Sequence, residues 1–63
     1  SAASDVYKRQ ALLGAAAPLL GIDAAKLESG IRAIFARKGG QVVETNLAAF
    51  HAGYEAAQKQ AKP

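Results

Sequence analysis

The chain has 63 residues, a net charge of +3 and no cysteine, and 51% of its residues are hydrophobic. The missing thiols exclude internal disulfides and cysteine-held zinc or iron–sulfur sites. A chain this short buries only a marginal core unless a partner polypeptide adds to it. Its basic residues are dispersed rather than gathered on one face, so the composition does not favour nucleic-acid binding.

The first ten residues, SAASDVYKRQ, share no periodicity with the rest of the chain. They resemble the translated transposase mosaic-end adapter used in preparing sequencing libraries. We therefore expect residues 1–10 to be a non-native segment and residues 11–63 to be the native part. An alternative is that Lys8 and Arg9 open a secretory signal, because an apolar run follows them. That run is shorter than the roughly 20 residues that a membrane span needs.

The segment from Ala11 to Leu20 predicts a first helix that is apolar nearly all round, a pattern typical of burial on several sides. Small residues from Gly14 to Ala17 predict the close approach of a neighbouring element, because such side chains leave the backbone accessible. Pro18 weakens this helix. Gly21 is well placed to end it, since glycine adopts the left-handed conformation common at helix ends.

Asp23 predicts the N-cap of a second helix, because its carboxylate can accept hydrogen bonds from the free amides of the first turn. Glu28 and Arg32 are four residues apart and predict an exposed ion pair on that helix. One face of the helix carries apolar side chains at helical spacing. These residues are Leu27, Ile31, Ile34 and Phe35.

The sequence Lys38-Gly39-Gly40 lacks the spacing of a phosphate-binding loop and predicts a helix break. A last helix, from Gln41 to Lys59, carries a second apolar stripe. This stripe consists of Val43, Leu47, Phe50 and Tyr54. Facing stripes predict a C-terminal helical hairpin. Because no strand alternation is present, the expected fold class is an all-α fragment with about three helices.

His51 is the only histidine, and one histidine without clustered ligands makes a poor metal site. Its spacing from Glu55, one turn on, allows a contact between the two. Asn46 lies beside the apolar stripe, and we expect it to bond a backbone outside this fragment. The sequence predicts no catalytic, cofactor-binding or metal-binding residue. The predicted packing and interaction residues are Leu27, Ile31, Phe35, Val43, Asn46, Leu47, Phe50 and Tyr54.

An ordered set of features runs through the chain after residue 10. It begins with a small-residue apolar helix, and its further parts are Lys26-Leu27-Glu28, Lys38-Gly39, Val42-Val43, Asn46-Leu47, Phe50 and Ala52-Gly53-Tyr54. In this order and spacing, the chain resembles the C-terminal end of the gamma subunit, or gamma domain, of the 2-oxoacid:ferredoxin oxidoreductases. The glycine-rich start and the sheet of that domain are missing here.

The resemblance implies a piece excised from a larger α/β domain of a cytoplasmic enzyme. The complete enzyme would oxidise a 2-oxoacid such as pyruvate to an acyl-coenzyme A, using thiamine diphosphate, iron–sulfur clusters and coenzyme A. The implied partners are the remainder of the gamma domain and the alpha, beta and delta parts, without nucleic acid or membrane. The piece would be inactive alone and contribute assembly contacts.

Two other readings stay open. The chain is also compatible with a free-standing small helical interaction module, which predicts that the first ten residues are encoded in frame after a start codon. The signal-like start suggests a secreted or membrane-active alanine-rich peptide, if Lys8 and Arg9 belong to the organism. The sequence does not distinguish between 2-oxoacids, or between a separate and a fused gamma subunit.

Overall fold

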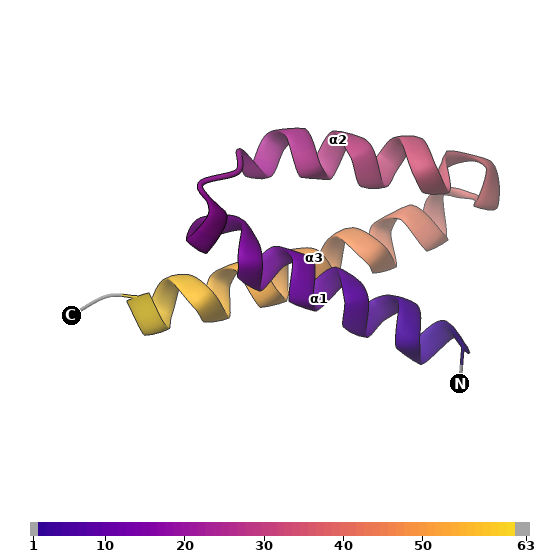
Figure 1. The fold of residues 1–63 in the computed structure, drawn as a ribbon. Coiled ribbons are helices and arrows are strands. Elements are labelled where there is room, and N and C mark those ends of the chain that lie inside the picture. Colours follow the sequence, from indigo (N-terminus) through magenta and orange to yellow (C-terminus); the bar gives the residue numbers. More distant parts are fainter. Residues whose placement is uncertain (1, 62–63) are drawn as a thin grey trace.

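The computed structural model describes residues 2–61, which form three α-helices joined by short connections (Figure 1). The helices are α1 (Ala2–Leu20), α2 (Ala24–Phe35) and α3 (Gly40–Ala61), and a 3₁₀ turn, Ala36–Lys38, lies between the last two. Residues 2–61 contain no strand. The expected all-α class is therefore confirmed.

The first connection reverses the chain within three residues, as the sequence predicts. Gly21 has a φ of 69°, and the Ile22 amide donates a hydrogen bond of 3.1 Å to the Ala17 carbonyl oxygen. This six-to-one bond is the mark of a Schellman helix end, in which glycine tolerates the positive φ. Asp23 then caps α2, since its side chain accepts a 3.0 Å hydrogen bond from the Ala25 amide. Both predicted helix boundaries are confirmed.

The second connection joins α2 to α3 and forms the predicted helical hairpin. The 3₁₀ turn ends at Gly39, whose φ is 105° and whose amide donates to the Ala36 carbonyl oxygen over 3.4 Å. The next helix begins immediately, at Gly40. The glycine pair therefore acts as the predicted helix break.

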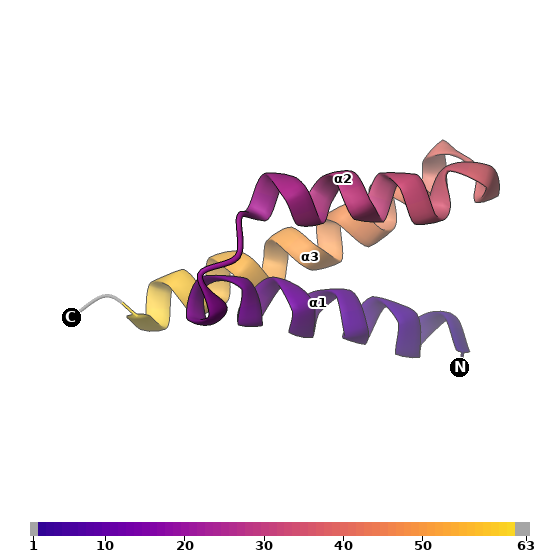
Figure 2. The same ribbon diagram turned by 45° about the horizontal axis from the view of Figure 1, so that its top comes forward.

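The helices α1 and α3 lie side by side and run in the same general direction (Figures 1 and 2). The helix α2 runs in the opposite direction, from the end of α1 to the start of α3. The contact between α1 and α3 is the most extensive in the molecule. The Cα atoms span 40 × 25 × 14 Å. Because packed helix axes lie about 8–10 Å apart, 14 Å is only two helices thick. Each helix therefore keeps one side open.

Two expectations for the first helix are wrong. It begins at Ala2 rather than at Ala11, because no glycine or proline interrupts residues 2–10 and the helix continues through the predicted junction. It is also not buried on several sides. Leu12, Leu19 and Leu20 are 70%, 81% and 66% exposed, since the only extensive neighbour of α1 is α3. Pro18 lies inside α1 without ending it.

The core lies where α2 and α1 meet α3. Its buried members are Ile31, Leu47 and Phe50. Half-buried apolar residues from all three helices surround them, namely Leu13, Ala24, Leu27, Phe35 and Val43. Such a cluster is small for an independent domain.

Candidate functional site

The predicted packing residues come together, mostly inside the chain. Ile31, Leu47 and Phe50 are only 3%, 4% and 0% exposed, and the Phe50 ring stacks on the Tyr54 ring with centroids 6.2 Å apart. Leu27, Phe35 and Val43 pack against this cluster. The expectation for Ile34 is wrong, because its side chain lies on the solvent side of α2 and is 72% exposed. The two hairpin stripes therefore pack mainly against each other. Contacts of these residues with another chain stay a prediction.

The helices α1 and α3 cross in close contact at two glycines. A methyl group placed on Gly14 would overlap the Phe50 carbonyl oxygen and lie 3.0 Å from the Tyr54 amide nitrogen. A methyl group on Gly53 would overlap the Ala11 carbonyl oxygen. Since the backbones touch directly, only glycine fits at either position.

The sequence predicts a close approach at Gly14 but gives no prediction for Gly53. A signal was available, because Ala49, Gly53 and Ala57 recur every four residues and place a row of small side chains on one face of α3. Rows four residues apart form the ridges and grooves through which helices pack. Apolar periodicity alone misses such a row, because it counts large side chains.

Asn46 is the one buried polar side chain in the described part of the chain, at 1% exposure. Its amide nitrogen donates a 2.8 Å hydrogen bond to the Val42 carbonyl oxygen, one turn earlier on α3. Its oxygen, Oδ1, has no hydrogen-bond partner among the described residues. The Asn46 amide nitrogen therefore bonds a carbonyl group of its own helix. The predicted bond to a backbone group outside the fragment stays a prediction, and only Oδ1 is left to form it.

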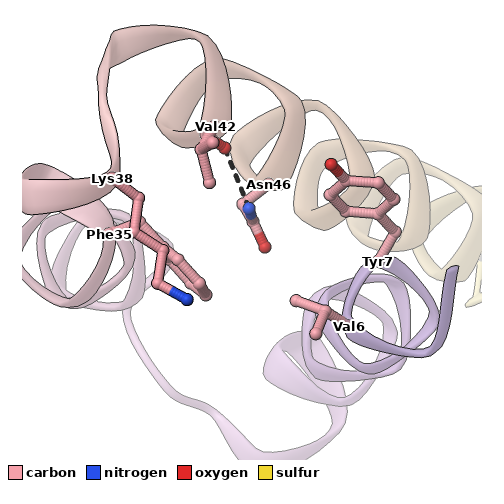
Figure 3. A pocket seen from close by; sticks show the side chains of 6 residues that line it. All are labelled: Val6, Tyr7, Phe35, Lys38, Val42 and Asn46. Atoms are coloured by element: carbon pink, nitrogen blue, oxygen red, sulfur yellow. Dashed lines mark hydrogen bonds between the residues drawn. The ribbon is translucent and has the colours of Figure 1, made fainter. Parts of the chain in front are cut away.

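A cavity of about 230 Å³ opens beside Asn46 (Figure 3), and we name it the Asn46 cavity. All three helices and the 3₁₀ turn contribute to its walls. The lining residues are Val6, Tyr7, Phe35, Lys38, Val42 and Asn46. Most of the wall is apolar, so its polar groups are few and each one matters for what the cavity can hold.

His51 contacts a different residue from the one that the sequence suggests. Its Nε2 atom lies 3.1 Å from Oε1 of Glu28 on α2, and its ring is in a T-shaped arrangement with the Phe50 ring, with centroids 5.7 Å apart. Pairing of His51 with Glu55, and of Glu28 with Arg32, does not form in the part of the chain that the structure describes. The packing of α2 on α3 brings Glu28 and His51 together, which spacing along one helix cannot reveal.

The described residues were also compared with the requirements of a metal site and of a membrane span. Residues 5–60 hold no group of three histidine, cysteine or acidic side chains that could bind a metal ion. No helix in the described range is long and apolar enough to cross a membrane. The fold and its polar contacts define a helical packing unit that leaves large apolar side chains exposed.

The sequence matches the family described as pyruvate ferredoxin/flavodoxin oxidoreductase over residues 2–56. The chain belongs to this family. Searches of curated proteins and of solved structures find no match to it. The match includes residues 2–10, and the adapter origin of this segment stays a prediction.

The family is one of oxidoreductases that use thiamine and iron–sulfur clusters. The residues present here do not fit either group. Iron–sulfur clusters are held by cysteine thiolates, and this chain has no cysteine. The acidic residues of the described helices form no cluster with each other or with His51 that could hold the divalent cation of a bound diphosphate. We therefore derive no catalytic step from these residues.

Proposed function

We propose that this chain is the C-terminal helical part of the gamma subunit, or gamma domain, of a 2-oxoacid:ferredoxin oxidoreductase. In this proposal it contributes assembly contacts to the oxidative decarboxylation of a 2-oxoacid to acyl-coenzyme A and is inactive alone. The family match over residues 2–56 is the observation that carries the proposal. The ordered features from Leu13 to Tyr54 support the gamma assignment.

The exposed apolar side chains support an origin within a larger domain. Leu12 and Leu19 are seven residues apart and therefore share one face of α1, where they are 70% and 81% exposed. Leu20, Ile22 and Ile34 are 66%, 41% and 72% exposed. Soluble monomers seldom expose so much large apolar surface in so short a chain. In the proposal, the sheet of the α/β domain covers the outer face of α1.

The proposed partners are the remainder of the gamma domain and the alpha, beta and delta parts, in the cytoplasm. Thiamine diphosphate, the iron–sulfur clusters and coenzyme A would be bound by those other parts. This division agrees with the ligand-poor composition of the chain. The segment 1–10 is proposed to be non-native, and residues 11–63 to be the native part.

A free-standing interaction module remains the second candidate, and one observation favours it. The helix α1 runs from Ala2 to Leu20 without a break at Ala11. A chain encoded as one unit would give this continuity. Reading the source DNA across the Ala11 junction separates the two candidates, because only the gamma proposal predicts a glycine-rich strand and turn upstream in the same frame.

A complementation experiment tests the assembly role directly. A gamma subunit truncated before the segment matching Ala11 would be co-expressed with residues 11–63, and 2-oxoacid-dependent reduction of ferredoxin would be measured. We expect activity only when both pieces are present. Changing Leu12 and Leu19 together to lysine should abolish the recovered activity, whereas the matched exposed change of Arg32 and Arg37 to glutamine should leave it intact. Equal activity of both variants would contradict the proposal.

A further inference from the structure

The unpaired oxygen of Asn46 lies in a place where a partner is needed. The side chain is 1% exposed, so Oδ1 has given up water without gaining a hydrogen bond from any described residue. The large majority of buried side-chain polar atoms in proteins have at least one hydrogen-bond partner. The unpaired Oδ1 therefore raises the question of which part of the native protein supplies its hydrogen-bond donor.

The walls of the Asn46 cavity limit the answer. On the α3 side, Val42 already accepts from the Asn46 amide nitrogen. On the α2 side, Phe35 offers only its ring and Lys38 is exposed, so its ammonium group keeps its hydration by staying at the rim. Figure 3 shows Asn46 pointing into the space between these residues and Val6 of α1. The side from which a donor is missing is therefore the side of α1.

That side of the cavity is built from residues 1–10, the segment that is proposed above to be non-native. Val6 lines the cavity with an apolar side chain that has no donor, and Tyr7 lines it without a hydrogen bond to Oδ1. Both belong to residues 1–10, which resemble adapter sequence and which we propose to be non-native. If this segment is non-native, it was not selected to pack against α3. An unpaired buried acceptor facing it is then expected.

We propose that Asn46 is a pairing residue whose Oδ1 accepts a hydrogen bond from a neutral donor side chain at the position of Val6 in the native protein. The donor is a hydroxyl or amide group, such as that of Ser, Thr, Asn or Gln. A cation is disfavoured, because Lys38 already places one positive charge on the same cavity. This inference rests on the proposed function, since it takes α1 to continue along α3 in the native gamma domain.

The first test uses the full 63-residue chain and a change that keeps the shape of the side chain. Val6→Thr adds a hydroxyl donor, and it would be made in the Asn46 background and in an Asn46→Leu background. We expect the thermal unfolding midpoint, followed by circular dichroism, to rise by about 4 °C or more only where Asn46 is present. In the Asn46→Leu background the same change should lower the midpoint, because the hydroxyl then lacks an acceptor. Equal shifts in both backgrounds would overturn the proposal.

Val43→Thr is the matched control for this cycle. Val43 is half-buried and lies on α3, the helix of Asn46. It packs against the apolar core and does not line the Asn46 cavity. We expect it to lower the midpoint by a similar amount in both backgrounds. A coupling of Val43→Thr to Asn46 as large as that of Val6→Thr would also overturn the proposal, because the effect would then not belong to the cavity.

The second test does not depend on the stability of the isolated chain. Sequencing the source DNA upstream of Ala11 gives the native residue at the position of Val6. A donor residue there supports the proposal. An apolar residue there, within a gamma domain, overturns this inference and leaves the proposed function standing. The absence of a gamma domain upstream overturns the proposed function instead, and an encoded SAASDVYKRQ overturns both.

Discussion

The glycine crossing of α1 and α3 gives the most direct test of the structure. In Gly14→Ala, the new methyl group meets the Phe50 carbonyl oxygen and the Tyr54 amide nitrogen, which are backbone atoms that cannot rotate away. Forcing an extra carbon into a packed contact costs about 1–3 kcal/mol. Alanine is a better helix former than glycine by about 0.5–1 kcal/mol. Subtracting the middle of the second range from the middle of the first leaves a net loss in the free energy of unfolding of about 1 kcal/mol.

Gly30→Ala is the matched control. Gly30 lies inside α2, is exposed, and has no atom within 4 Å of an added methyl group. The same gain in helix propensity, about 0.5–1 kcal/mol, therefore appears without a steric cost. Thermal unfolding of both variants would be followed by circular dichroism, where about 1 kcal/mol shifts the midpoint by about 4–8 °C in a domain of this size. We expect the midpoint to fall for Gly14→Ala and to rise for Gly30→Ala.

The close approach of α1 to α3 at Gly14 is refuted if Gly14→Ala raises the midpoint as much as Gly30→Ala does. That result would mean that α1 is helical but does not approach α3 through Gly14. Gly53→Ala probes the same contact from the other helix, where the added methyl group would overlap the Ala11 carbonyl oxygen. It should therefore behave like Gly14→Ala. A loss for one of these two variants and a gain for the other would exclude the observed register of the two helices.

Three further changes test other parts of the fold. Asp23→Ala removes the carboxylate that accepts from the α2 amide and should lower the free energy of unfolding by about 1 kcal/mol in urea titrations; no change would exclude the cap. Phe50→Ala deletes a fully buried ring, a loss of about 3–5 kcal/mol, so we expect the helical signal to lose its cooperative transition. A double-mutant cycle with Glu28→Gln and His51→Gln, measured at about pH 5 so that histidine carries its charge, should give a coupling of about 0.2–1 kcal/mol, which falls at an ionic strength of about 1 M. A coupling that salt leaves unchanged would contradict an exposed ion pair.

Local rules in the sequence determined the helices and their ends. Gly21, Asp23 and the glycine pair after Lys38 each act within a few residues of their own position, so the two connections follow from the sequence without knowledge of the fold. The apolar stripes of α2 and α3 could also be predicted from the sequence, because helical periodicity fixes which side chains share a face. The start of α1 was not predicted correctly. The boundary was expected at Ala11 because residues 1–10 resemble adapter sequence, but no residue near Ala11 ends or caps a helix.

Contacts between helices decided the rest. The glycine crossing, the pairing of His51 with Glu28 and the unpaired oxygen of Asn46 each depend on where one helix lies relative to another. Sequence spacing predicts neighbours only within one helix, so it placed Glu55 beside His51 and Arg32 beside Glu28. The sequence alone identified the helices and the family resemblance, whereas the tertiary structure decided which polar groups are paired, because pairing requires the distance between atoms on different elements.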